Sequence, residues 1–332
     1  MNRAKKMTTT AFSPSAKIAL LQQAMRTQPQ SAALLREFSE TLAEAGQERE
    51  AADVFRRAYL LEPGICSKAM ARVGSDRIGW LRTYSRSLIA NGVAYAPVIA
   101  ALAVAEAHLG NGAEVQRLVD YDRLFRSTIM APPDGYDQDS FYVALANEIK
   151  SGLKFYDAPP NRAIRHAWRR SIAGSALPAS RAWVQAIRRE VDRYIAALPQ
   201  ESDHPFVASR PSDYILGAWA LVSDGASYHV PHIHPRAWMS GVFYVIRPPV
   251  SRDAASRRGW LEVGPPEELY GVSTAHGWGA RTIAPEPGRV VLMPGYFFHG
   301  THPMGVDEER ICIAFDVMPA ELAGEDSDTI EI

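Results

Sequence analysis

Two histidines separated by a single residue, His232 and His234, are the first residues whose chemistry can be inferred from the sequence. On an extended strand, residues two apart project from the same face, because side chains alternate. A third histidine, His299, follows an apolar segment nearer the C-terminus. Neutral imidazoles bind iron, zinc, copper and nickel. The three residues therefore predict a transition-metal site, in which they are both the metal ligands and the candidate catalytic residues.

Two further histidines lie near these three in the sequence. His229 precedes His232 by three positions, so on a regular strand it would face another direction. His302 follows His299 by three positions and is an alternative to it as the distal ligand. A single histidine is usually an ordinary surface or hydrogen-bonded residue. Five of the nine histidines near two predicted strand ends favour a metal site instead.

An arginine near the C-terminus adds a second chemical function. Arg310 opens the alternating segment 310–316, in which it shares a face with Cys312. An arginine that points into a protein interior needs an anionic partner, because burying an unpaired charge is strongly unfavourable. Its planar guanidinium suits a carboxylate, which it binds through two parallel hydrogen bonds. We therefore predict a carboxylate ligand for Arg310; the alternative is a surface arginine that follows the charged turn 307–309.

Composition narrows the class of protein. The chain has 332 residues, 47% of them hydrophobic and 22% charged, with a formal net charge of −1. This composition is typical of a globular protein and offers no basic field that would attract nucleic acid. Cys66 and Cys312 are too few for a disulfide framework. Residues 1–10 do not resemble a signal peptide, and no apolar run has the length of a membrane span. We expect a cytoplasmic protein without a membrane or nucleic-acid partner.

The order of the predicted elements indicates two parts. Residues 32–63 carry apolar residues at helical spacing around Gly46 and resemble a tetratricopeptide repeat, a pair of packed helices. Residues 98–125 are expected to be another helix pair, and helices are also expected at 139–153 and 179–198. From residue 213 onward the pattern is that of strands, at Tyr214–Val222, Met239–Ile246, Arg289–Met293 and Ile311–Val317. Short strands separated by Pro and Gly turns predict a barrel or sandwich.

Four sequence blocks together resemble a known superfamily. They are His232-x-His234-Pro235, Ser240-Gly241-Val242-Phe243-Tyr244-Val245, the segment 292–300 that contains His299, and the segment 310–315 that begins with Arg310. In this order they are similar to the iron(II)- and 2-oxoglutarate-dependent dioxygenases, and more narrowly to a prolyl-hydroxylase-like branch. The resemblance covers roughly residues 205–320. It implies an α+β fold, with an N-terminal tetratricopeptide-like helical region and a double-stranded β-helix (jelly-roll) domain that is braced by helices.

The resemblance also implies roles for individual residues. His232, His234 and His299 would hold Fe(II), although most of the superfamily has Asp or Glu at the position of His234. Arg310 would bind the distal carboxylate of the cosubstrate 2-oxoglutarate, with Cys312 and Tyr244 beside it. The reaction would convert 2-oxoglutarate and dioxygen to succinate and CO2 while it hydroxylates a substrate. A helix at 179–198 would brace the outside of the barrel.

The identity of the substrate and the role of the helices stay open at this stage. A peptidyl substrate fits if the helical repeats bind a protein partner, and a small molecule fits equally well. The expected division of the chain is 15–130 for the helical region, 131–204 for a connector with bracing helices, and 205–320 for the oxygenase domain. One alternative is a cupin-like protein with three histidine ligands and no 2-oxoglutarate. Another is a non-enzymatic helical-repeat protein, in which the three histidines would lie apart.

Overall fold

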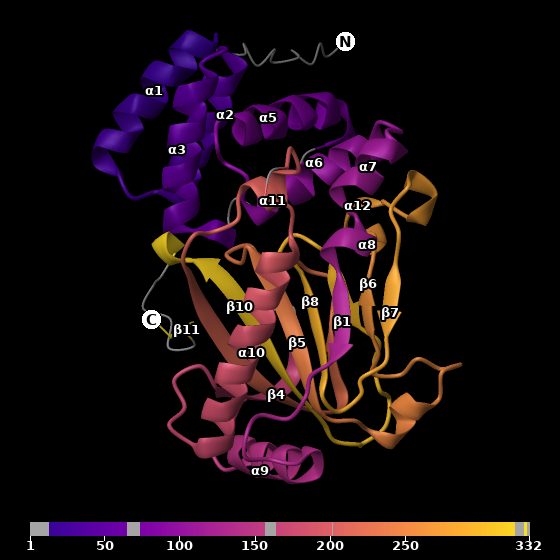
Figure 1. The fold of residues 1–332 in the computed structure, drawn as a ribbon. Coiled ribbons are helices and arrows are strands. Elements are labelled where there is room, and N and C mark those ends of the chain that lie inside the picture. Colours follow the sequence, from indigo (N-terminus) through magenta and orange to yellow (C-terminus); the bar gives the residue numbers. More distant parts are fainter. Residues whose placement is uncertain (1–12, 65–73, 157–163, 201, 323–328, 331–332) are drawn as a thin grey trace, which may run out of the picture.

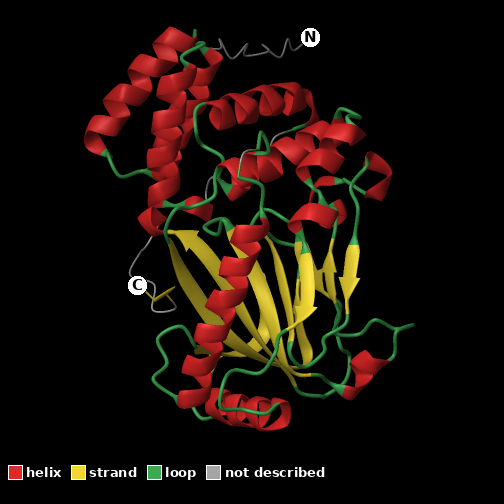
Figure 2. Ribbon diagram, in the orientation of Figure 1, coloured by secondary structure: helices red, strands yellow, loops and turns green. Residues whose placement is uncertain are grey.

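The protein combines an N-terminal group of helices with antiparallel sheets (Figure 1). The structure is a computed structural model that describes residues 13–64, 74–156, 164–200, 202–322 and 329–330. Helices α1 to α8 gather above one end of the larger sheet, and the remaining chain contains the strands (Figure 2). We call residues 14–124, apart from 65–73, the helical region.

The described helices have the following bounds: α1 Pro14–Thr27, α2 Ala32–Glu44, α3 Glu48–Leu61, η1 Ser75–Arg77, α5 Ile78–Ala90, α6 Ala96–His108, α7 Gly112–Leu118, α8 Tyr121–Leu124, α9 Gln138–Lys150, α10 Pro178–Ala197, α11 Pro205–Ala208, η2 Pro249–Arg252, α12 Glu267–Tyr270, η3 Thr274–His276 and η4 Ala320–Leu322. The strands are β1 Arg126–Ile129, β2 Lys154–Tyr156, β3 Ile164–Ser171, β4 Tyr214–His229, β5 Met239–Ile246, β6 Leu261–Val263, β7 Arg281–Ile283, β8 Arg289–Pro294, β9 His299–Thr301, β10 Arg310–Pro319 and β11 Thr329–Ile330.

The helix pair predicted at 32–63 is present as α2 and α3. Ser31 caps α2 by accepting a hydrogen bond from the backbone N–H of Leu34, and Gly46 turns the chain with a φ of +78°. The helices predicted at 98–125, 139–153 and 179–198 are confirmed as α6 to α8, α9 and α10. Helix α6 is buried on all sides: Val98 and Ala101 belong to the core of the helical region, whereas other residues of α6 belong to the core around the larger sheet.

The larger sheet positions most of the predicted site residues. Its strand order is β1-β8-β5-β10-β4-β3-β2, with β11 also paired to β4, and every pairing is antiparallel. A smaller sheet has the order β7-β6-β9. The four strands predicted from the sequence are confirmed as β4, β5, β8 and β10, and β4 extends further, to His229. Strand β10 lies between β4 and β5, so Arg310 has a place near the centre of the sheet.

Helices α9 and α10 cover one face of the larger sheet (Figure 2). The Trp183 ring of α10 lies 6.1 Å from Phe243 of β5 and 5.9 Å from Phe315 of β10, measured between ring centroids. A side chain on Gly241 would collide with Phe315, because its Cβ would lie only 2.4 Å from the ring. Phe243 and Phe315 thus face the helices, and the residues next to them along β5 and β10 point to the opposite face of the sheet.

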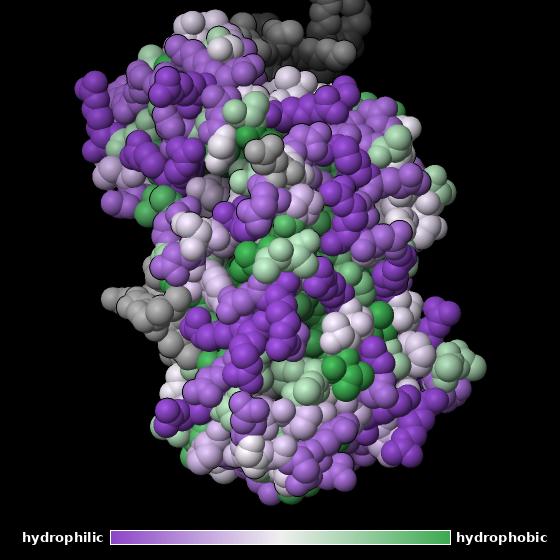
Figure 3. Space-filling model, in the orientation of Figure 1, coloured by the Kyte–Doolittle hydropathy of each residue, from purple (hydrophilic) through white to green (hydrophobic). Residues whose placement is uncertain are grey.

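The remaining predictions about the whole chain have mixed outcomes. Cys312 is a free, buried cysteine, while Cys66 and the segment 1–10 lie outside the described residues. None of the described helices has the length and apolar character needed to cross a membrane. On the face drawn in Figure 3, hydrophobic residues are scattered among hydrophilic ones, which is ordinary for a protein surface.

Candidate metal and cosubstrate site

Two chain segments carry the three histidines, and backbone hydrogen bonds join them. We call residues 230–238 the first ligand segment and residues 295–299 the second. His232 and His299 exchange two backbone hydrogen bonds of 3.0 Å, and the His234 N–H donates to the Gly295 carbonyl at 2.9 Å. The strand expected at His232 and His234 is reduced to this single bridge. Residue 295 must be glycine, because a Cβ there would lie 2.1 Å from the Ala237 carbonyl oxygen.

The three imidazoles converge on one point. One ligand atom from each of His232, His234 and His299 lies within 4.8 Å of the others, and the Nε2 atoms of His232 and His234 are 3.2 Å apart. The Nδ1 atoms of His232 and His299 lie 2.9 Å from the carbonyl oxygens of Val230 and Phe297. A carbonyl oxygen only accepts, so each Nδ1 carries the proton and donates. Both Nε2 atoms consequently have free lone pairs, as metal binding requires.

Burial keeps the imidazoles of His232 and His299 neutral. It lowers the pKa of His232 to about 3 and lowers the pKa of His299 well below the ordinary value of 6.5. The neighbouring histidines lower both values further, because each imidazolium would repel the next. Neutral imidazole is the form that coordinates metal ions, so His232 and His299 need no deprotonation near neutral pH.

A carboxylate that the sequence analysis missed stands behind His234. The Nδ1 of His234 donates to Asp316 Oδ1 over 2.5 Å, and both side chains are largely buried. Asp316 lies on β10 and shares its face with Cys312 and Arg310, because these positions alternate. A buried Asp in an apolar strand is unusual and needs a partner, and this was the available signal. A hydrogen bond and the imidazole ring therefore separate this negative charge from the His234 Nε2 that would bind a metal.

Arg310 is buried at the other end of β10. It is 1% exposed, so the alternative of a surface arginine is wrong. One terminal nitrogen donates to the Gly259 carbonyl at 3.1 Å, and the other lies 3.4 Å from Ser223 Oγ. Its Nε has no partner within the described part of the chain, and no described carboxylate forms an ion pair with it. Such a buried cation is expected to be compensated by an anionic ligand.

The wall between Arg310 and the histidines comes from three neighbouring strands. Cys312 lies opposite Leu221 of β4 and Tyr244 of β5, and the three side chains form a small cluster. Burial raises the pKa of the Cys312 thiol and of the Tyr244 phenol, which keeps both neutral. The Trp219 ring stacks beside that of His234 at 6.2 Å. The two residues expected beside Arg310 thus face the same interior.

The two other nearby histidines, His229 and His302, do not belong to this group of three. His302 Nε2 lies 2.8 Å from a Glu262 carboxylate oxygen, and its side chain is 35% exposed. His229 stacks on His232 with a centroid distance of 6.0 Å, and its Nδ1 lies 3.4 Å from Thr301 Oγ1. Burial lowers the pKa of His229 well below its usual value. Among the described residues, only His232, His234 and His299 form a group of three possible ligands whose ligand atoms all lie within 4.8 Å of one another.

Residues 217–316 match the model of a protein family described as "Putative 2OG-Fe(II) oxygenase". The matched residues include all three histidines, Arg310 and Asp316. The chain contains a 2OG-Fe(II) oxygenase domain. Enzymes of this family use Fe(II) and 2-oxoglutarate with dioxygen.

Several solved structures resemble the chain. A prolyl-4-hydroxylase from Pseudomonas putida is 15% identical, with a TM-score of 0.41 over 61% of this chain and 98% of that one. A prolyl hydroxylase from Trichoplax adhaerens, in complex with a hypoxia inducible factor peptide fragment, is 15% identical, with a TM-score of 0.44 over 65% and 92%. A 2OG-Fe(II) oxygenase family protein from Burkholderia pseudomallei is 13% identical, with a TM-score of 0.40 over 65% and 92%. A search of curated proteins gives no match.

The donor set fits the metal that this family uses. Convergent imidazole lone pairs without protons between them repel one another unless a cation lies among them, and imidazole is a good ligand for iron. Three neutral ligands would leave the metal with its full charge, which the Asp316 carboxylate partly offsets through His234. The residues present are thus suited to a divalent transition-metal ion.

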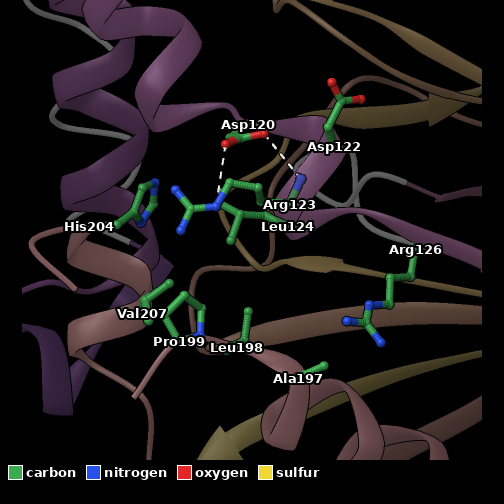
Figure 4. A pocket seen from close by; sticks show the side chains of 10 residues that line it. All are labelled: Asp120, Asp122, Arg123, Leu124, Arg126, Ala197, Leu198, Pro199, His204 and Val207. Atoms are coloured by element: carbon green, nitrogen blue, oxygen red, sulfur yellow. Dashed lines mark hydrogen bonds and ion pairs between the residues drawn. The ribbon is translucent and has the colours of Figure 1, made fainter. Parts of the chain in front are cut away.

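A pocket lies away from the three histidines (Figure 4). It has a volume of about 270 Å³, and its lining includes Asp120, Asp122, Arg123 and His204. Asp120 pairs with Arg123 at 3.9 Å, and Asp122 pairs with Arg281 at 2.8 Å. Burial lowers the pKa of His204, which favours its neutral form. The acidic groups of this pocket are therefore paired within the fold, and the pocket shares no residue with the metal site.

Replacing Asp316 with Asn tests the contribution of its charge. Asn retains an oxygen that accepts from His234 Nδ1 but removes the negative charge. We expect metal binding to weaken by about tenfold, within the range found for groups that orient metal-binding histidines. Mn(II) titration followed by electron paramagnetic resonance measures the change. Asp192→Asn is the control, because Asp192 accepts from Tyr214 far from the histidines; equal affinities of D316N and the wild type would contradict the assignment.

The buried histidines predict a pH dependence of stability. An unfolded chain binds a proton at His232 below pH 6.5, whereas the folded protein does so only near pH 3. The free energy of unfolding of the metal-free protein should therefore fall as the pH decreases through this window, by at most about 1.4 kcal/mol per pH unit for this histidine. Urea unfolding at pH 7, 6 and 5 measures the slope. His232→Asn should make the slope shallower and His302→Asn should not; equal slopes for all three proteins would refute the prediction.

Proposed function

We propose that His232, His234 and His299 bind Fe(II), that Arg310 binds the distal carboxylate of 2-oxoglutarate, and that the domain hydroxylates a C–H bond. The substrate class is a peptidyl or a small-molecule compound. Cys312 and Tyr244 are proposed to line the cosubstrate cavity, and Asp316 to orient His234. One observation supports this most directly: three imidazoles converge on a site whose interior also holds a buried arginine without an anionic partner among the described residues.

Each residue has a physical task in this proposal. The Nδ1–H bonds of His232 and His299 to backbone carbonyls fix the ring orientations before the metal arrives. Arg310 binds one end of the cosubstrate bidentately and so directs its other end toward the histidines. Leu221, Tyr244 and Cys312 exclude water from the space between. When bound, iron(II) supplies the activation of dioxygen that these side chains cannot perform by themselves.

The alternatives differ in how well they agree with the site. A cupin-like metalloprotein without 2-oxoglutarate is favoured by one observation, the absence of a carboxylate from the group of three described ligands. It leaves the burial of Arg310 without a purpose. The non-enzymatic alternative required the three histidines to lie apart, and this is contradicted because they lie together.

The finer architecture belongs to the same proposal. We infer a double-stranded β-helix for residues 205–320, tetratricopeptide-like packing within 15–130, and bracing helices within 131–204. The cover of α10 over the larger sheet supports the bracing role. A protein partner at the helical region and a cytoplasmic location both stay predictions.

Anaerobic titration of the metal-free protein tests the proposed function. Fe(II) is added first and 2-oxoglutarate second, while the visible absorption spectrum is recorded. We expect a weak charge-transfer band that appears only with both additions, because the 2-oxo acid must chelate the metal. Succinate, which lacks the 2-oxo group, is the matched control and should give no band. Iron binding without a band would favour the cupin-like alternative, and no iron binding would refute the metal site.

A further inference from the structure

The helical region touches both ligand segments, although it contributes no metal ligand. In the first segment, the contact is made by Tyr59 of α3. Its hydroxyl donates to the carbonyl of Pro235, the residue after His234, over 2.5 Å. The Tyr59 ring is itself held by Tyr95, which stacks on it with a centroid distance of 3.9 Å and an interplanar angle of 7°. A rigid, buried phenol from the helices therefore defines the position of the backbone beside His234.

In the second ligand segment, the donor phenol belongs to the ligand segment and the acceptor carbonyl belongs to the helical region. The hydroxyl of Tyr296 donates to the Leu118 carbonyl at the end of α7 over 2.6 Å, and both residues are buried. The next residue, Phe297, packs on Tyr121 with a centroid distance of 5.0 Å. The carbonyl of Phe297 is also the acceptor for His299 Nδ1. The helices thus contact the residue that orients the third imidazole.

A third attachment lies at the end of β10, the strand of Arg310 and Asp316. After Pro319 the chain enters η4, and Leu322 is buried in the core of the helical region. The Arg236 guanidinium of the first ligand segment donates to the Leu322 carbonyl at 3.2 Å. Figure 1 shows the end of β10 directed toward the helices. The two ligand segments and β10 therefore all contact the helical region or end in it.

We propose that the helical region is a structural part of the metal site, in which Tyr59 and Tyr296 are positioning residues for the two ligand segments. The inference rests on the proposed metal-binding function of the histidines. Metal affinity depends on ligand placement to within about 0.5 Å, and backbone supports of the ligands set that placement. Because the two ligand segments are also bonded to each other through His232, His299, His234 and Gly295, a shift at either tyrosine is transmitted to the whole donor set.

The test compares Mn(II) affinity with stability in four variants. Tyr59→Phe removes the hydroxyl that donates to the half-buried Pro235 carbonyl, and Tyr296→Phe removes the hydroxyl that donates to the buried Leu118 carbonyl. We expect Mn(II) binding to weaken by about fivefold in each, less than the ~10–100-fold found for groups bonded to the ligands themselves. Tyr84→Phe and Tyr194→Phe are matched controls: these phenols are buried too, and their hydroxyls bond to Ser39 and to the Leu124 carbonyl, which are not part of either ligand segment.

The outcomes separate the inference from the function on which it rests. Weakened Mn(II) binding in Y59F and Y296F, with unchanged binding in Y84F and Y194F at a similar loss of melting temperature, supports the inference. Unchanged binding in Y59F and Y296F, or equal weakening in the controls, overturns it while the metal site stands. His299→Ala is measured in parallel: if this variant binds Mn(II) as the wild type does, the metal site itself is wrong and the inference falls with it.

Discussion

Arg310→Ala should raise the 2-oxoglutarate concentration needed for half-maximal activity by at least about 100-fold. The reason is that removing one partner of a buried charge pair costs several kcal/mol of binding free energy. Metal affinity should stay close to that of the wild type, since Arg310 bonds to Gly259 and Ser223 and to none of the histidines. The measurement is 2-oxoglutarate-dependent succinate formation, with Mn(II) titration beside it. When a substrate has not been identified, the anaerobic Fe(II) and 2-oxoglutarate band serves as the readout.

Two further variants sharpen this prediction. Arg310→Lys keeps the charge but loses the planar pair of donors, so it should recover only part of the affinity for 2-oxoglutarate. Arg289→Ala is the control, because Arg289 lies on β8, which β5 separates from β10, and pairs with Glu286. Equal loss of metal and 2-oxoglutarate binding in Arg310→Ala would show that the residue supports the fold rather than the cosubstrate.

His299→Ala should abolish metal binding at micromolar metal concentrations. The variant would keep only two of the three imidazoles, and the alanine would leave a cavity beside them. Two neutral ligands from the protein are too few to hold the ion. Metal content after dialysis and Mn(II) titration both measure the loss. His302→Ala is the matched control, since this histidine is partly exposed and pairs with Glu262. Retention of metal in His299→Ala together with loss in His302→Ala would transfer the ligand role to His302.

Much of the fold was predictable because its elements have regular periodicity. The mostly apolar run 239–246 before a proline turn and the three- and four-residue spacing in 179–198 predicted β5 and α10 to within one residue at each end. The HxH pattern and His299 predicted which imidazoles would meet, and alternation along β10 predicted that Arg310 and Cys312 share a face. The repeat family of the helices stays a prediction, since helix pairs of this kind pack alike in many folds.

What escaped prediction depends on contacts between segments distant in the sequence. In the sequence, Asp316 is only the last residue of an apolar segment. Its partner, His234, lies 82 positions away, and the two meet only in the folded protein. The first ligand segment is irregular because Gly295 and His299 pair with it at single positions rather than along a strand. The hydrogen bond from Tyr59 to Pro235 joins residues 176 positions apart, and no periodicity indicates such a contact.

The burial of α6 on all sides, from Ala96 to Ala107, has a consequence for how this protein can change over evolution. Its residues belong to two hydrophobic cores at once, with Val98 and Ala101 on one side and Ile99 and Leu102 on the other. A single-residue insertion in α6 would rotate the following residues by about 100° and exchange the surfaces they present to the two cores. The helical region is therefore difficult to swap for an unrelated one, and we expect the two halves to be inherited as a unit.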